Sequence, residues 1–154
     1  MKIDYNSLLS EMIDTFGESK TMVLATAFGE KVTARSMSCV FDGINILFQT
    51  DSGFQKVEQI MNNTNVALCY QNIQIEGAAK LCGHPAEKQN EIFIEKFKKS
   101  FKSSFELYSD MKNEIVIEVN PTLITIWKYE NGKPLRDYLD VCGKLAYREY
   151  YLIE

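Results

Sequence analysis

The sequence predicts a mainly β protein, an antiparallel barrel of about six strands with helices at its periphery. Two observations lead to this prediction. Short runs rich in β-branched and aromatic residues follow one another through tight turns, such as Asp42-Gly43 and Gln71-Asn72. Only two helical segments interrupt these strands, too few for the regular alternation of strand and helix in a parallel α/β sheet.

The first third of the chain contains a predicted helix followed by three predicted strands. Apolar residues from Leu8 to Phe16 recur at helical spacing, and Gly17 ends the helix. Strand periodicity and the turns between the runs then predict strands over residues 22–28, 32–40 and 44–50.

The rest of the chain is predicted to hold two helices and four strands. Ser52 is expected to cap a helix over residues 53–61, and phenylalanines at four-residue steps from Phe93 to Phe101 mark the second helix. A tyrosine-rich tail follows Asn131-Gly132. The strands are expected over residues 66–70, 73–81, 113–119 and 123–127. Because no linker or repeat separates these elements, residues 1–154 are expected to form a single domain.

The composition excludes several classes of function. A formal net charge of −4 argues against a protein that coats nucleic acid, but it permits a local basic cluster for one small anion. No run approaches the roughly 20 apolar residues that span a bilayer, and the first residues lack a signal-peptide pattern, so a cytoplasmic protein is expected. The four cysteines show no CxxC spacing and His84 is the only histidine, so no metal site is expected.

A charged residue interrupts a strand that is otherwise typical of a buried core. Arg35 lies within the predicted strand over residues 32–40. Burying an unpaired guanidinium group is costly, so Arg35 needs a negatively charged partner. That partner is either a bound anion or a carboxylate of the protein, such as Asp42.

The segment from Phe48 to Lys56 joins a strand to a helix and combines hydroxyl groups with a lysine. Thr50 and Ser52 add hydroxyl donors, Lys56 adds a positive charge, and the helix N-terminus offers free N–H groups. This combination suits a phosphate group, although the glycines of a Walker loop are missing. The alternative is an ordinary capped helix with a surface lysine.

Polar side chains alternate with isoleucines around the start of the predicted strand over residues 73–81. Asn72, Gln74 and Glu76 fall on one face of it. Such a row suits hydrogen bonding to a planar heteroaromatic ring or to a ribityl chain; the alternative is a solvated sheet face. The only tryptophan, Trp127, is either a cofactor contact or a core residue.

The order of these segments resembles the pyridoxamine 5'-phosphate oxidase-like family of FMN-binding split barrels. The segments are LAT followed by R-x-M, then FQTD before a helix lysine, NVAL, IQIEG-x-A and PTLITIW. They cover residues 21–127. The region over residues 121–150 resembles small single-domain bacterial members of the nitroimidazole-resistance and general-stress-protein type.

The resemblance implies an antiparallel six-stranded split β-barrel of Greek-key type, assembled as a homodimer with FMN at the subunit interface. One subunit is expected to hold FMN through the strand from Arg35 and the segment after Gln49, and the partner through the strand from Asn72. One basic position of the family is an amide here, Gln55. The residue patterns and the resemblance together predict the cofactor-binding residues Arg35, Ser36, Met37, Ser38, Gln49, Thr50, Ser52, Gln55, Lys56, Asn72, Gln74, Glu76 and Trp127.

The resemblance also implies an oxidoreductase that passes electrons from NAD(P)H through FMN to a small organic acceptor. The oxidase reaction itself is not expected. Val40 stands where the oxidase has a lysine for its substrate phosphate, and Pro134-Leu135-Arg136 lacks the oxidase histidine. No catalytic residue is assigned, and His84 either lines the substrate cavity or is a loop residue. The rival hypothesis is a flavin- or haem-binding carrier or redox sensor without turnover.

Overall fold

Strands dominate the structure, a computed structural model that describes residues 1–151. Nine strands within these residues join into one antiparallel sheet, in the order β1-β9-β8-β7-β4-β3-β2-β5-β6. Because β6 also pairs with β7, part of this sheet closes on itself. No helix of the described residues has the length and apolar content needed to cross a membrane.

Six of the strands form the closed barrel: β2 (Ser19–Phe28), β3 (Lys31–Asp42), β4 (Asn45–Asp51), β5 (Asn65–Tyr70), β6 (Ile73–Leu81) and β7 (Glu114–Glu130). The strands β2, β3 and β4 are consecutive neighbours, whereas β5 returns to pair with β2. This is the Greek-key arrangement. The predicted antiparallel six-stranded barrel is therefore confirmed.

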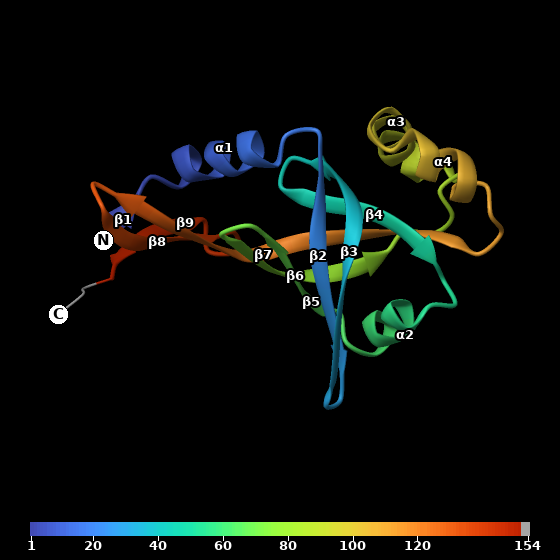
Figure 1. The fold of residues 1–154 in the computed structure, drawn as a ribbon, viewed down its shortest axis with the longest axis horizontal. Coiled ribbons are helices and arrows are strands. Elements are labelled where there is room, and N and C mark those ends of the chain that lie inside the picture. The colour runs from blue at the N-terminus through green and yellow to red at the C-terminus, as the bar shows by residue number, and fades with distance from the viewer. Residues whose placement is uncertain (152–154) are drawn as a thin grey trace.

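The barrel is split between β3 and β4. These strands pair at only three positions, between Val40 and Asp42 on β3 and between Asn45 and Leu47 on β4. Figure 1 shows the two strands leaving their common end in different directions. Residues 31–39 of β3 pair with β2 alone, so their other edge faces an opening instead of a strand.

Helices pack around the barrel: α1 (Tyr5–Phe16), α2 (Gln55–Asn62), the 3-10 turn η1 (Lys88–Asn90), α3 (Glu91–Ser100) and α4 (Lys102–Tyr108). The helix predicted around Phe93 to Phe101 is thus two helices, because the backbone of Phe101 leaves the helical region between α3 and α4. Phe93 and Phe97 of α3 pack on Val40 and Leu47, outside the barrel at the end where β3 and β4 meet.

The prediction that Ser52 caps the helix after β4 is wrong. The helix α2 begins at Gln55, with Phe54 as its N-cap residue and no capping side chain. An Asp51 side-chain oxygen instead accepts a hydrogen bond from the Gly53 N–H at 2.7 Å. This aspartate turn occupies the predicted first residues and delays the start of the helix.

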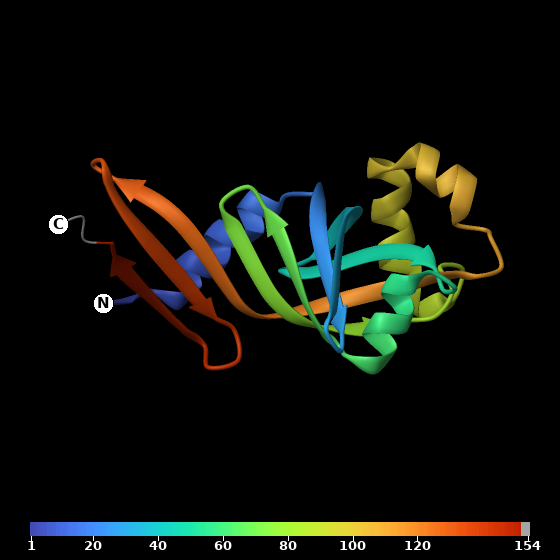
Figure 2. The ribbon, with the colours of Figure 1, turned by 60° about the horizontal axis from the view of Figure 1, so that its bottom comes forward.

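The chain beyond the barrel departs most from the sequence prediction. The strand β7 is a single strand of 17 residues where two were expected, because Pro121 lies opposite Gly77 at a bulge, where a proline is tolerated. Its second half pairs with β8 (Lys133–Asp140), at first while residues 123–126 still pair with β6 and then, over residues 127–130, beyond the barrel. The strands β9 (Leu145–Tyr150) and β1 (Lys2–Ile3) follow β8 in this extension. Figure 2 shows this extension at the end of the molecule opposite α4. The tyrosine-rich tail therefore forms strands, which aromatic residues favour.

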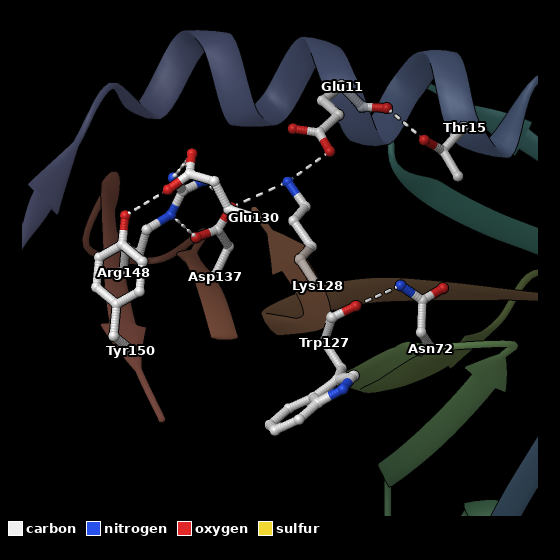
Figure 3. A network of polar contacts seen from close by, with 9 residues as sticks. All are labelled: Glu11, Thr15, Asn72, Trp127, Lys128, Glu130, Asp137, Arg148 and Tyr150. Carbon is white, nitrogen blue, oxygen red and sulfur yellow. Dashed lines mark hydrogen bonds and ion pairs between the residues drawn. The ribbon is translucent and has the colours of Figure 1, made fainter. Parts of the chain in front are cut away.

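A buried carboxylate ties the extension to α1. Asp137 of β8 is fully buried and forms ion pairs with Lys128 at 2.9 Å and with Arg148 at 2.7 Å. Lys128 also pairs with Glu11 of α1 at 2.6 Å, and Figure 3 shows these side chains meeting between the helix and the strands. A buried charge is tolerated where it is paired. The network therefore holds α1 against β7, β8 and β9.

Candidate functional site

A cavity of about 380 Å³ lies in the split of the barrel. This volume falls within the range of small-molecule sites, roughly 300–1,000 Å³. One wall comes from β3 and the other from β4, and α4 with the residues after it closes one end. The lining residues are Ser36, Met37, Ser38, Gln49, Thr50, Asp51, Phe54, Phe97, Ser104, Tyr108, Met111 and Glu114. The first five of these are predicted cofactor residues.

Arg35 is partly buried on β3 and is held by neutral groups. Its guanidinium donates hydrogen bonds to the Leu24 carbonyl at 3.3 Å, to Thr26 Oγ1 at 2.8 Å and to Thr33 Oγ1. Burial lowers the pKa of Arg35. Asp42, the alternative partner, is exposed at the end of β3 and does not pair with it. The need of this guanidinium for an anion is therefore not met by a described carboxylate.

Lys56 brings a second positive charge to the same region. Its Nζ donates a hydrogen bond to Thr50 Oγ1 at 2.9 Å and lies 4.7 Å from the centre of the Phe54 ring. Burial and then the charge of Arg35 lower the pKa of Lys56, so the two cations lie within electrostatic reach of each other. Neither forms an ion pair with a residue in the range 1–151. Two such cations favour binding of an anion.

A residue that sequence reasoning missed positions Arg35. The amide of Gln59 in α2 is 3% exposed, and its Oε1 accepts hydrogen bonds from Thr26 at 2.6 Å and from Thr33 at 2.7 Å. Both threonine hydroxyls in turn contact the guanidinium of Arg35. The signal in the sequence is a glutamine at a core-facing position of a predicted helix, between Val57 and Ile60, which are both buried.

Two carboxylates belong to the other wall of the cavity. Asp51 and Glu114 are register partners on β4 and β7, and Glu114 is 8% exposed. Burial and then the Asp51 carboxylate raise the pKa of Glu114, whereas His84 and Lys56 lower it in part. Sequence spacing did not mark Glu114, because β7 reaches the split only through its pairing with β4.

His84 is a loop residue and does not line the cavity. Its Nδ1 accepts a hydrogen bond from the Ala86 N–H at 3.0 Å, so Nε2 carries the proton and donates to the Met111 carbonyl at 2.8 Å. Both ring nitrogens are thus engaged by backbone groups. Of the two interpretations that the sequence left open, the structure favours the loop residue.

Arg35 and Lys56 lie beside the cavity without lining it, and two further predicted site residues on the same side also stay outside the lining. Ser52 and Gln55 are exposed on the segment that leads into α2, and neither is a lining residue. The backbone N–H of Ser52 donates to the Asn113 carbonyl at 2.8 Å, which fixes this segment against the residues that precede β7. Both residues lie close to Lys56 along the chain.

The predicted amide strand lies on the other side of the barrel. Asn72, Gln74 and Glu76 are exposed and the isoleucines between them are buried, so the expected alternation is confirmed. The ring order β3-β2-β5-β6-β7-β4 puts β6 across the barrel from the split. Within one chain, the structure does not bring these three side chains to Arg35 and Lys56.

Trp127 accompanies the amide strand and is not a core residue. Its backbone N–H donates to the Asn72 carbonyl at 3.0 Å, and the Asn72 side chain donates to the Trp127 carbonyl at 2.5 Å. The partly exposed indole ring lies 5.1 Å from the Arg136 guanidinium and 5.9 Å from the Tyr129 ring. Figure 3 shows it pointing away from α1, on the face of the strand opposite to Lys128.

Comparisons with known proteins place the chain among relatives of this architecture. The family described as pyridoxamine 5'-phosphate oxidase matches residues 9–128, which confirms the resemblance drawn from the order of the sequence segments. No curated protein matches the chain.

Three solved structures share the fold. General stress protein 26 of Bacillus anthracis is 25% identical with a TM-score of 0.58, over 75% of this chain and 91% of that one. A pyridoxamine 5'-phosphate oxidase-related, FMN-binding protein of Nostoc punctiforme is 12% identical with a TM-score of 0.60, over 96% and 95%. The haem storage protein HutZ of Vibrio cholerae is 11% identical with a TM-score of 0.60, over 77% and 91%.

Proposed function

The chain belongs to the pyridoxamine 5'-phosphate oxidase family, and from this premise we propose that it is an FMN-dependent oxidoreductase. Its electron donor is NADH or NADPH, and its acceptor is a small organic molecule such as a quinone or a nitroaromatic compound. FMN, when bound, supplies the redox chemistry, and the protein binds it, orients it and tunes its hydrogen bonding.

The observation that carries this proposal is the pair of cations beside the cavity, neither of which forms an ion pair with a residue in the range 1–151. FMN ends in a phosphate dianion, and Arg35 and Lys56 offer matching charge, with the Thr50 hydroxyl next to Lys56. Each charge-assisted hydrogen bond of this kind contributes roughly 1.5–3 kcal/mol. Thr26 and Thr33 already orient the Arg35 guanidinium, so binding costs little additional side-chain ordering.

The remainder of the cavity wall suits a flavin ring. Residues 31–39 of β3 have β2 as their only strand partner, so peptide groups on the other edge are free to bond with the polar rim of the ring. Ser36 and Ser38 lie along this edge. Gln49 faces it from β4, and the Ser109 hydroxyl donates to the Gln49 Oε1 at 2.9 Å, which fixes the amide.

A second copy of the chain supplies the other half of the site in this proposal. Gln74 and Trp127 lie across the barrel from the split, so a two-fold axis that brings them to the partner's split creates two equivalent sites. The outer face of β2, β5 and β6 suits burial in such a dimer. Val23 and Cys69 form one cross-strand row with Gln74, and both are exposed.

The environment of His84 favours flavin over haem. HutZ shares the fold and is a haem storage protein, and haem iron is commonly held by a histidine nitrogen. Both nitrogens of His84 are engaged by the backbone, and the cavity lining includes no histidine among residues 1–151.

The oxidase reaction of the family's namesake is not part of the proposal. Val40, at the position of the lysine that binds the substrate phosphate, is fully buried beneath Phe93 and Phe97 of α3. Arg136 lies over the Trp127 ring, with no histidine beside it in β8. The chain therefore lacks the lysine and the histidine that contact the substrate in the oxidase, and of that set only Arg136 is present.

A visible spectrum and a steady-state assay test the proposal. The purified protein is expected to show the two-banded absorption of flavin and to release FMN, and not FAD, on denaturation. With an added quinone or nitroaromatic acceptor, it is expected to oxidise NADH or NADPH at roughly 1 s⁻¹ or faster. An intense Soret band would contradict the flavin assignment, and FMN binding without turnover would contradict the enzymatic part.

A further inference from the structure

Glu114 is an acid without a partner in the wall of the cavity. It is 8% exposed and lies beside Thr50 and Asp51. Among residues 1–151, no side chain donates a hydrogen bond to its carboxylate and none forms an ion pair with it. The buried Asp137, by contrast, is met by two cations. The Glu114 carboxylate oxygens still reach solvent, but burial of the rest of the side chain disfavours the charged form.

Charged and titratable groups face Glu114 from each element around it. Asp51 of β4 is its register partner, Lys56 approaches from α2, His84 approaches from the loop after β6, and Tyr108 of α4 lines the same cavity. Burial and Asp51 oppose the charged carboxylate, whereas His84, when its ring is protonated, and Lys56 favour it. The protonation of Glu114 therefore depends on how much of the Lys56 charge it experiences.

We propose that Glu114 takes up a proton when an anion binds at Arg35 and Lys56, which couples binding in the cavity to pH. A bound dianion neutralises the Lys56 charge that favours the carboxylate, and its own negative charge repels the carboxylate. At a pH between the midpoint of the free protein and the higher midpoint of the complex, a fraction of one proton from solvent is added to a Glu114 oxygen for each anion bound. The neutral carboxyl group becomes a hydrogen-bond donor in place of a repelling charge.

This inference rests on the proposed function only for the identity of the anion. FMN is the anion that the proposed function names, whereas the coupling itself needs only a dianion beside Lys56. Inorganic sulfate is therefore an independent probe, because it remains a dianion across the range in which carboxyl groups titrate.

A carbon-13 NMR titration of the glutamate carboxyl carbons tests the proposal directly. Spectra are recorded across pH for the protein alone, with sodium sulfate and with FMN, and Glu114→Gln identifies the Glu114 signal by its loss. In the free protein this signal is expected to titrate above the usual glutamate value of about 4.3. Either anion is expected to raise its midpoint by about 0.5 pH unit or more. Glu118→Gln, on the same strand but outside the cavity lining, is the matched control and leaves the rise intact.

Calorimetry provides a second measurement. FMN is titrated in two buffers of different ionisation enthalpy, which gives the number of protons taken up per FMN. At a pH midway between the two Glu114 midpoints, wild type is expected to take up roughly 0.3–0.5 proton more than Glu114→Gln. Because the repulsion is removed, Glu114→Gln is expected to bind FMN about 3- to 10-fold more tightly at pH 8.

The outcomes separate this inference from the proposed function. A Glu114 signal that moves with neither anion overturns the inference, as does equal proton uptake in wild type and Glu114→Gln. A signal that moves with sulfate in a protein that does not bind FMN supports the inference and contradicts the proposed function.

Discussion

At the scale of single residues, partly buried charge decides which ligands suit the cavity. Arg35 is oriented by two threonine hydroxyls, which are themselves fixed by the buried amide of Gln59. Lys56 is fixed by Thr50. These contacts orient both cations without an ion pair, so both can donate charge-assisted hydrogen bonds to a phosphate group.

Replacing either cation tests this account. Arg35→Ala and Lys56→Ala are each expected to weaken FMN binding about 10- to more than 100-fold, through loss of charge-assisted hydrogen bonds. Riboflavin has no phosphate, so its weaker binding is expected to change little. The measurement is a calorimetric titration with both ligands, and Lys99→Ala, whose exposed side chain pairs with Glu18, is the control. Equal affinity of the wild type for FMN and riboflavin would remove the phosphate argument.

At the scale of elements, the buried Asp137 determines how α1 and the extension hold together. Burial alone would raise the pKa of Asp137, but hydrogen bonds from Arg148 and Lys128 outweigh it, and the pKa is lowered. Lys128 carries the link on to Glu11 of α1. Three segments distant in the sequence thus meet at one carboxylate.

Removing this charge is expected to cost stability in a pH-dependent way. Asp137→Asn removes the carboxylate that Lys128 and Arg148 share, and these cations keep only their pairs with Glu11 and Glu130. The variant is expected to lower the free energy of unfolding by about 3–5 kcal/mol at pH 7. Because the pKa is lowered in the folded state, the contribution is complete above the unfolded-state value of about 3.9 and is lost as pH falls through the folded-state value. The difference in free energy of unfolding between variant and wild type therefore narrows below about pH 4.

Urea unfolding curves at several pH values measure this difference. The control is Asp42→Asn, at an exposed aspartate outside the network, with an expected change within about 0.5 kcal/mol. An Asp137→Asn protein as stable as wild type at pH 7 would show that the network does not hold the extension.

At the scale of the whole molecule, the two halves of the proposed flavin site lie on opposite sides of one barrel. The split and its cations are on one side, and the amide strand with Trp127 is on the other. A single chain cannot close such a site, whereas a two-fold dimer completes both sites together.

Light scattering tests this arrangement. The protein is expected to have twice the 17.7 kDa mass of one chain at micromolar concentration. Val23→Glu places a charge on the exposed outer row and is expected to give monomers that bind FMN at least tenfold more weakly. Ile92→Glu, at an exposed position of α3, is the matched control and is expected to remain dimeric. A wild-type monomer that binds FMN tightly would contradict the shared site.

The sequence by itself determined the type and order of the barrel elements, because strand periodicity and turn residues act between near neighbours. The sequence also marked Arg35 and Lys56 as candidates for binding an anion, since a charge in an apolar strand and a lysine at a helix start are local patterns. The residues of the tail were not assigned to strands, because β8 and β9 have partners only where β7 leaves the barrel.

Only the tertiary structure decided where the barrel splits and what lines the split. The early end of pairing between β3 and β4, the pairing of β7 with β4 that brings Glu114 to Asp51, and the contact of Gln59 with Thr26 all join segments distant in the chain. Such contacts follow from long-range strand register and packing, which no local period encodes. The charges of the proposed site can therefore be recognised in the sequence, but the cavity beside them exists only in the folded barrel.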